Sequence, residues 1–254
     1  MHVRTLILSL FIMLAFPKVQ HAQVSLQDSS IRMGVMRIGY AMVIPGQEWA
    51  ERYGTSHSIA LEAGLQFPNR LVFSVEGGYL FGNNIIEEGI LAPLRTSAGL
   101  IINDAGTLSD VAINLDGFYA SVLGGVVLPV IPSHTPNSGI FIQAGPSFLQ
   151  HKLRFNLQGE SVSALAGNSK RGFDRLTQGW GLKGRIGYQL YSKTGFINLS
   201  MGISYAIYQS TNQRGINYDT GEITGGEVTD SALGVFLSWN LLFYKRAPNK
   251  VYYY

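Results

Sequence analysis

Ser147 and His151 stand four positions apart, and a serine hydroxyl beside an imidazole is the pairing that nucleophilic hydrolysis uses. The two groups must lie within hydrogen-bonding distance. Their segment has strand patterning, however, and four extended residues span about 13 Å, so direct pairing fails. Asp219, Glu222 and Glu227 match no calcium-loop spacing either. The sequence therefore predicts no catalytic residue, no metal site and no cofactor.

Five charged residues fall on segment faces that otherwise carry mostly glycine and serine. They are Arg37, Glu62, Glu76, Lys183 and Arg185. A narrow interior built from such faces would bury all five, and an unpaired buried charge is costly. Opposite charges are therefore expected to pair, which predicts a structural salt-bridge network that neither conducts nor catalyses.

The elements that position these charges are strands, because period-two alternation runs through eight segments. Leu61 and Leu65, for example, share one face of their segment. Glu62 and Gly64 share the other. The predicted strands are Arg32–Ile44, Ser58–Phe67, Leu71–Phe81, Asp116–Val130, Ile140–Leu157, Trp180–Tyr191, Ile197–Tyr208 and Ala232–Tyr244.

The connections alternate between short turns and long loops, which is typical of outer-membrane barrels. Two interpretations differ in which face points outward: a soluble ligand-binding barrel and a membrane barrel. Roughly five large apolar residues on each strand exceed what an eight-stranded interior holds, whereas the opposite face is small. The sequence therefore predicts an all-β, eight-stranded antiparallel transmembrane β-barrel with short periplasmic turns and long extracellular loops. In 140–157 the apolar parity changes between Phe148 and Leu153, which indicates either a β-bulge or the departure of the strand from the membrane.

Composition agrees with an exported barrel. Only 14% of the 254 residues are charged, 46% are hydrophobic and 30 are glycine. The net charge of +3 comes with no Lys/Arg-rich run, so no nucleic-acid partner is expected. The absence of cysteine excludes disulfides and thiolate metal sites.

The N-terminus predicts export. His2 and Arg4 precede an apolar run, Leu6–Phe16, and a polar region ends at Ala22, which is the order of a secretory signal. The alternative is a single N-terminal anchor, for which the run is short. We expect a signal peptide at 1–22, a periplasmic segment at 23–30, the barrel at 31–244 and a tail at 245–254.

Some loop residues are candidates for contact with a partner or with lipopolysaccharide. Trp49 and Tyr53 would share one side of a helical turn and either cap the barrel mouth or meet a partner. Lys170, Arg171 and Arg175 either contact lipopolysaccharide phosphates or belong to a solvated loop. The apolar connection 82–113 either folds over the barrel or docks a partner.

The alternating strands, the signal and the aromatic last strand, with Trp239, Phe243 and Tyr244, resemble the small OmpA/OmpX-type barrels. Gln23 after the predicted cleavage site and the Gly- and Tyr-rich strands further resemble Bacteroidetes outer-membrane β-barrel proteins, including the PorT-like group. The tail after the last strand departs from that pattern, because the assembly signal of such families normally ends the chain.

The resemblance implies an outer-membrane location in a Gram-negative bacterium, with outer-membrane lipid, lipopolysaccharide and the barrel-assembly machinery as partners. The function expected is a non-catalytic barrel with a filled lumen that anchors or assists an envelope complex in secretion, assembly or surface attachment, with an envelope protein as partner. A narrow pore and a lipid-active enzyme are the alternatives.

Overall fold

The computed structural model describes residues 30–131, 135–158, 161–192, 197–221 and 223–244. The predicted signal peptide and C-terminal tail lie outside these ranges. The main strands are β1 (Met33–Gln47), β2 (Ser56–Gln66), β3 (Leu71–Gly82), β5 (Leu108–Leu128), β6 (Gly139–Gln158), β7 (Thr177–Tyr191), β8 (Asn198–Asn212) and β11 (Glu227–Phe243). The small elements are α2 (Glu48–Arg52), β4 (Ile101–Ile102), β9 (Gly215–Ile216), β10 (Ile223–Thr224) and the 3-10 turns η1 (Ala92–Leu94), η2 (Ser163–Leu165) and η3 (Ser169–Gly172).

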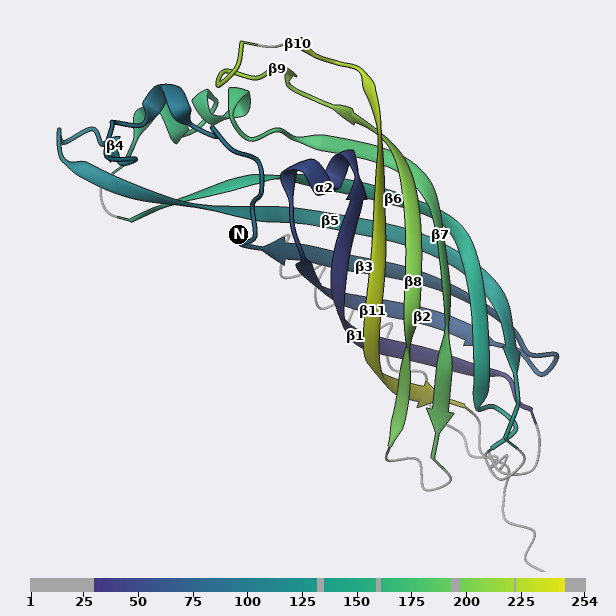
Figure 1. Cartoon of the computed structure of the whole chain (residues 1–254). Coiled ribbons are helices and arrows are strands. Elements are labelled where there is room, and N and C mark those ends of the chain that lie inside the picture. Colours follow the sequence, from purple (N-terminus) through teal and green to yellow (C-terminus); the bar gives the residue numbers. More distant parts are fainter. Residues whose placement is uncertain (1–29, 132–134, 159–160, 193–196, 222, 245–254) are drawn as a thin grey trace, which may run out of the picture.

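The eight main strands form a closed antiparallel ring. Each pairs with its neighbour in sequence, and β1 pairs with β11 to close the sheet. The predicted all-β, eight-stranded barrel is confirmed. In Figure 1 the long connections, with α2, β4, β9 and β10, gather toward the upper left, and the strands end in short turns toward the lower right. These ends are called the loop end and the turn end.

The register of the ring sets its width. Starting at Met33 and stepping between paired residues around the barrel returns to β1 at Val43, a stagger of ten residues. With a rise of about 3.3 Å per residue and a strand spacing of about 4.8 Å, the strands tilt by about 41° and the ring radius is roughly 8 Å. Such a ring holds side chains but leaves no wide channel.

The outer face is apolar across the barrel. Ile203 and Leu237 are half exposed, and neighbouring strands present similar side chains, among them Ile38, Ile59, Leu61, Phe73, Val75, Val122, Leu182 and Met201. The opposite face of the same strands is buried and small or polar. An apolar belt this continuous indicates that hydrocarbon, not water, surrounds the barrel.

Strand ends at the loop end are the main departure from the predicted boundaries. β5 begins at Leu108, eight residues before its predicted start, and β11 begins at Glu227. Beyond Leu115, the last residue that it pairs with β3, β5 continues alongside β6 and β4. The added residues of β11 pair with β8. Pattern alone missed them because no hydrocarbon lies beside them to require an apolar outer face.

The structure of β6 also explains why the apolar parity changes between Phe148 and Leu153. Its register with β5 and with β7 runs without an inserted residue, so the β-bulge interpretation is wrong. Odd-numbered residues from Phe141 to Leu153 are buried, except for the half-buried Gly145. The inner side turns apolar at Leu149 and Leu153 because these residues pack against the loops that cover the mouth.

A folded cap covers the loop end. Trp49 and Tyr53 from the first long loop join Ile90 and Leu91 from the second and Phe173 from the third in one buried cluster. The connection 82–113 therefore folds over the barrel. None of the helices among the described residues is long and apolar enough to cross a membrane.

The outer face yields a matched prediction. Leu61 is 53% exposed on the belt and Leu108 is 58% exposed on the β5 extension. We expect Leu61→Arg to lower the free energy of unfolding in lipid vesicles by about 2–4 kcal/mol, because the guanidinium would enter hydrocarbon. Leu108→Arg should change it by less than about 0.5 kcal/mol. Urea titration measures both, and equal effects would contradict a lipid-facing belt.

Candidate functional site: the barrel interior and its cap

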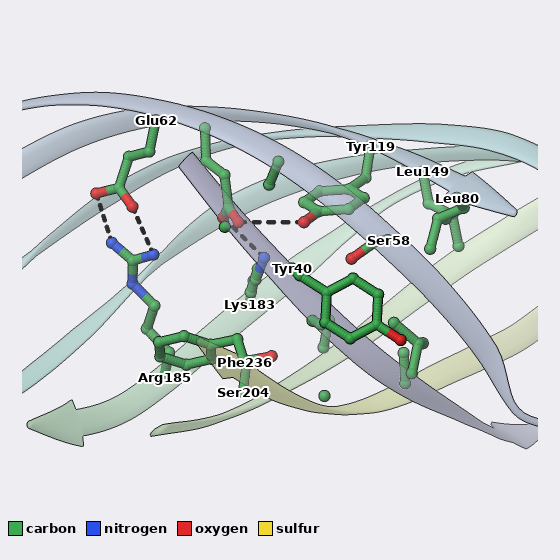
Figure 2. Close-up of a pocket in the computed structure, with 18 of the residues that line it drawn as sticks. Tyr40, Ser58, Glu62, Leu80, Tyr119, Leu149, Lys183, Arg185, Ser204 and Phe236 are labelled. Atoms are coloured by element: carbon green, nitrogen blue, oxygen red, sulfur yellow. Dashed lines mark hydrogen bonds and ion pairs between the residues drawn. The ribbon is translucent and has the colours of Figure 1, made fainter. Parts of the chain in front are cut away.

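The five charged residues singled out in the sequence meet inside the barrel. Arg37 from β1 and Arg185 from β7 both bind Glu62 on β2; the Arg185 contacts measure 2.6 and 2.8 Å. Figure 2 shows the two parallel bonds between Arg185 and Glu62. All three side chains are buried, so this charge-assisted cluster crosses the lumen from wall to wall.

A second ion pair lies beside the first. Lys183 Nζ donates to Glu76 at 2.7 Å, and the Tyr119 hydroxyl donates to the same carboxylate at 3.2 Å. The Lys183 ammonium also lies 4.3 Å from the centre of the Tyr119 ring. Lys183 and Tyr119 are labelled in Figure 2. Together the two clusters form a charged layer across the ring.

Amides close the lumen below this layer, toward the turn end. Gln189 donates to Gln66 at 2.9 Å and to the carbonyl of Asn137 at 2.8 Å, and Arg37 donates to Gln189. Met33 and Tyr191 are almost fully buried beside them. The layer and these amides are called the floor.

Above the floor the lumen is less filled. A chamber of about 60 Å³ lies between the charged layer and the cap. Its lining combines small residues on β1, β8 and β11 with larger ones on several strands: Gly39, Ala41, Ser204, Ala206, Ala232 and Gly234, together with Tyr40, Tyr119, Leu149, Tyr208 and Phe236. The floor therefore blocks the barrel, but the space above it is not packed solid.

The cap begins with Trp49 on α2. Its ring stacks on His151 at a centroid distance of 5.2 Å, and Tyr53 meets the same imidazole edge-on at 5.3 Å. His151 Nε2 lies 3.4 Å from Asp230 Oδ2. Burial raises the pKa of the Tyr53 phenol above its ordinary value. Trp49 and Tyr53 thus cap the mouth, one of the two roles expected for them.

Ser147 and His151 have separate partners. Ser147 Oγ lies 2.7 Å from Ser121 Oγ and 3.1 Å from the Tyr208 hydroxyl, whereas His151 contacts Asp230. Among the described residues, the Ser147 hydroxyl and the His151 imidazole share no hydrogen bond.

Arg175 requires a correction, because it does not lie on a solvated loop surface. It is 1% exposed and pairs with Glu87 at 2.6 Å and Asp219 at 2.7 Å. Glu87 also binds Arg52 at 2.8 Å. These four residues come from the four long loops, so the ion-pair chain ties the whole cap together. Lys170 and Arg171, by contrast, are exposed.

Asp104 makes a second tie between loops. Its carboxylate accepts bonds from the Ser163 backbone N–H and from the hydroxyls of Ser163 and Ser161, each at 2.9 Å. The backbone N–H of Ser163, followed by the hydroxyls, holds the Asp104 pKa below its ordinary value. The contact therefore stabilises the cap above pH about 3.9 and is lost as the pH falls through the lowered value.

An open cleft of about 580 Å³ lies over the mouth and is called the mouth cleft. Acidic residues dominate its charge, and Arg52 and His151 are the basic residues in the lining. Apolar side chains lie among them. The lining includes Glu48, Glu51, Glu87, Glu88, Asp230, Trp49, Ile86, Ile223 and Val228.

Two features were outside the reach of sequence reasoning. The His151–Asp230 contact joins residues 79 positions apart, and the Asp104 contact joins loops that share no repeat or motif. One signal was present for the first: His151 stands on the parity that carries the buried face of β6, so a strand model with the correct parity would have placed it inside.

No protein-family model and no curated protein matches the chain. Among solved structures, it is similar to the attachment invasion locus protein Ail of Yersinia pestis, with 13% identity and a TM-score of 0.38 over 83% of this chain and 99% of that chain. OprG of Pseudomonas aeruginosa is 11% identical, with a TM-score of 0.40 over 86% of this chain and 99% of that chain. The outer membrane protein AlkL is 12% identical, with a TM-score of 0.43 over 89% of this chain and 97% of that chain. With TM-scores below 0.5, the barrel assignment depends on the strand pairing of this chain itself.

The ion-pair chain gives a second matched prediction. Arg175→Met should loosen the cap, because it leaves Glu87 and Asp219 without their shared cation, whereas Arg171→Met removes only an exposed charge. Limited proteolysis of the folded barrel should cleave the long loops at least tenfold faster in Arg175→Met and at an unchanged rate in Arg171→Met. Equal rates in the two variants would show that Arg175 does not hold the cap.

Proposed function

We propose that this chain is an integral outer-membrane barrel that neither conducts nor catalyses and that anchors an envelope protein at its loop end. The observation that carries the proposal is the closed floor beneath a folded cap. A barrel built to pass solute would leave its lumen open, and here Arg37, Glu62 and Arg185 cross it. The apolar belt supports insertion in a bilayer.

The mouth cleft supports a protein as the anchored partner. It is wide and open, and Ile223, 88% exposed, lines it together with Glu48, Glu51 and Glu88. An exposed apolar side chain in a cleft lined by several acids suits a polypeptide segment that carries both basic and apolar residues. Lys170 and Arg171, exposed elsewhere on the cap, are proposed to contact lipopolysaccharide phosphates.

The closed floor predicts an electrically silent protein. In planar bilayers we expect no conductance steps from the wild-type barrel. A variant that removes the crossing cluster together with the amides below it, Arg37→Ala with Glu62→Ala, Arg185→Ala, Gln66→Ala and Gln189→Ala, should show steps, because neither layer of the floor then crosses the lumen and no unpaired charge remains there. Steps from the wild-type barrel would favour the narrow-pore alternative and contradict this proposal.

The mouth cleft predicts a charge-dependent contact. A photo-crosslinking residue in place of Ile223 should give one discrete protein adduct in intact cells, and Glu48→Lys with Glu51→Lys and Glu88→Lys should reduce its yield at least fivefold. Asp110→Lys, an exposed acid outside the cleft, is the control and should leave the yield unchanged. Absence of a discrete adduct, or equal loss in the control, would contradict protein anchoring at this site.

A further inference from the structure

The chamber above the floor has an excess of positive charge. Arg37, Lys183 and Arg185 line it, against Glu62 and Glu76. Glu62 is shared by two guanidiniums, and Glu76 is taken up by Lys183 and Tyr119. The next carboxylate toward the mouth, Asp230, pairs with His151 and does not line the chamber.

One donor of this cation set has no partner. Arg37 is 3% exposed, and its Nε has no hydrogen-bond acceptor among the described residues. A buried N–H of a charged group without an acceptor is costly, and so is a buried charge without a counter-ion. The excess cation belongs to the lining of the chamber, and one bound anion would balance its charge.

The upper part of the chamber is apolar. Val43, Leu80, Leu149 and the Trp49 ring line it, while alanine and glycine on the wall leave it open. A volume of about 60 Å³ accommodates roughly four to six waters, or one molecule with a similar number of non-hydrogen atoms. The chamber is therefore positive at its base and apolar toward its roof.

We propose that this chamber is a binding site for a small organic monoanion, a short-chain carboxylate of up to about six non-hydrogen atoms. Its carboxylate lies at the base, next to the Arg37, Lys183 and Arg185 cations. Its alkyl group packs under Trp49 and Leu149. This site is separate from the anchoring surface of the proposed function and does not depend on it.

Trp49 provides the route of entry. It lines both the chamber and the mouth cleft, so its indole separates the two spaces. The residue before α2, Gln47, has a positive φ of 57°, a strained conformation for a non-glycine residue. Rotation of the backbone there would lift α2 and Trp49 together and connect the chamber with the cleft.

Trp49 also supplies the measurement. In a Trp180→Phe, Trp239→Phe background, the emission of the refolded barrel in detergent comes from Trp49, and sodium formate, acetate, propionate and butyrate are titrated at constant ionic strength. We expect a saturable change whose midpoint falls along this series, by up to about fourfold per added methylene. Sodium chloride serves as the inorganic comparison and should bind more weakly than butyrate.

Three variants test whether binding depends on the net charge of the lining or on one particular side chain. Lys183→Met makes the lining neutral and should weaken butyrate binding at least tenfold. Glu76→Gln raises the excess and should tighten it. Combining Lys183→Met with Glu76→Gln restores an excess of one cation and should restore binding to within about threefold of the parent. Heat-modifiable migration on gels verifies that each variant is folded.

Specific outcomes would overturn the site. No saturable response to any carboxylate would show that the chamber is not a binding site, and equal midpoints from formate to butyrate would exclude the apolar roof as a contact. Equal affinity in Lys183→Met and the parent would exclude the cation excess as its basis. None of these results would bear on anchoring at the mouth cleft, which the cross-linking yield tests separately.

Discussion

Hydrocarbon offers no hydrogen-bond partner to a peptide group, and the strand ring follows from that constraint. Every N–H and C=O that lies within the belt must find its partner on a neighbouring strand, so the sheet closes through the β1–β11 pairing and leaves no free edge. Closure with eight strands and a ten-residue stagger then limits the radius, and the radius limits what the inner face may carry. Bulky residues such as Ile203 and Leu237 consequently lie outside, where lipid accommodates any size.

The inner face must both fill the narrow lumen and accommodate buried charges. Glycine and serine leave room for three cations and two carboxylates, and the shared use of Glu62 by Arg37 and Arg185 holds opposite walls together at one level. Buried ion pairs contribute little net stability relative to a well-packed apolar core, because desolvation offsets their attraction. Their presence is better explained by two consequences. The ion pairs close the lumen at the floor, and the excess of cations makes the chamber above it electropositive.

The cap obeys different rules from the barrel because water reaches it. Its strands extend past the belt without apolar outer faces, its core draws residues from several loops, and the Arg52–Glu87–Arg175–Asp219 chain fixes the loops relative to one another. Since Trp49 belongs to this cap and also roofs the chamber, a partner bound in the mouth cleft and a ligand in the chamber would both act on the same indole. That shared residue joins the outer surface to the interior.

Alternation of side chains along the strands was enough to determine the barrel, its strand count, the outward face of residues such as Leu61 and the inward position of Arg37, Glu62, Glu76, Lys183 and Arg185. The physical reason is that a strand between hydrocarbon and a crowded lumen has two unlike environments, and each residue type suits only one. Only the tertiary structure decided how the loops lie, because their contacts join distant residues in water, where no periodic pattern is required. It therefore alone placed Arg175 in the interior of the cap, His151 against Asp230, and the chamber between floor and roof.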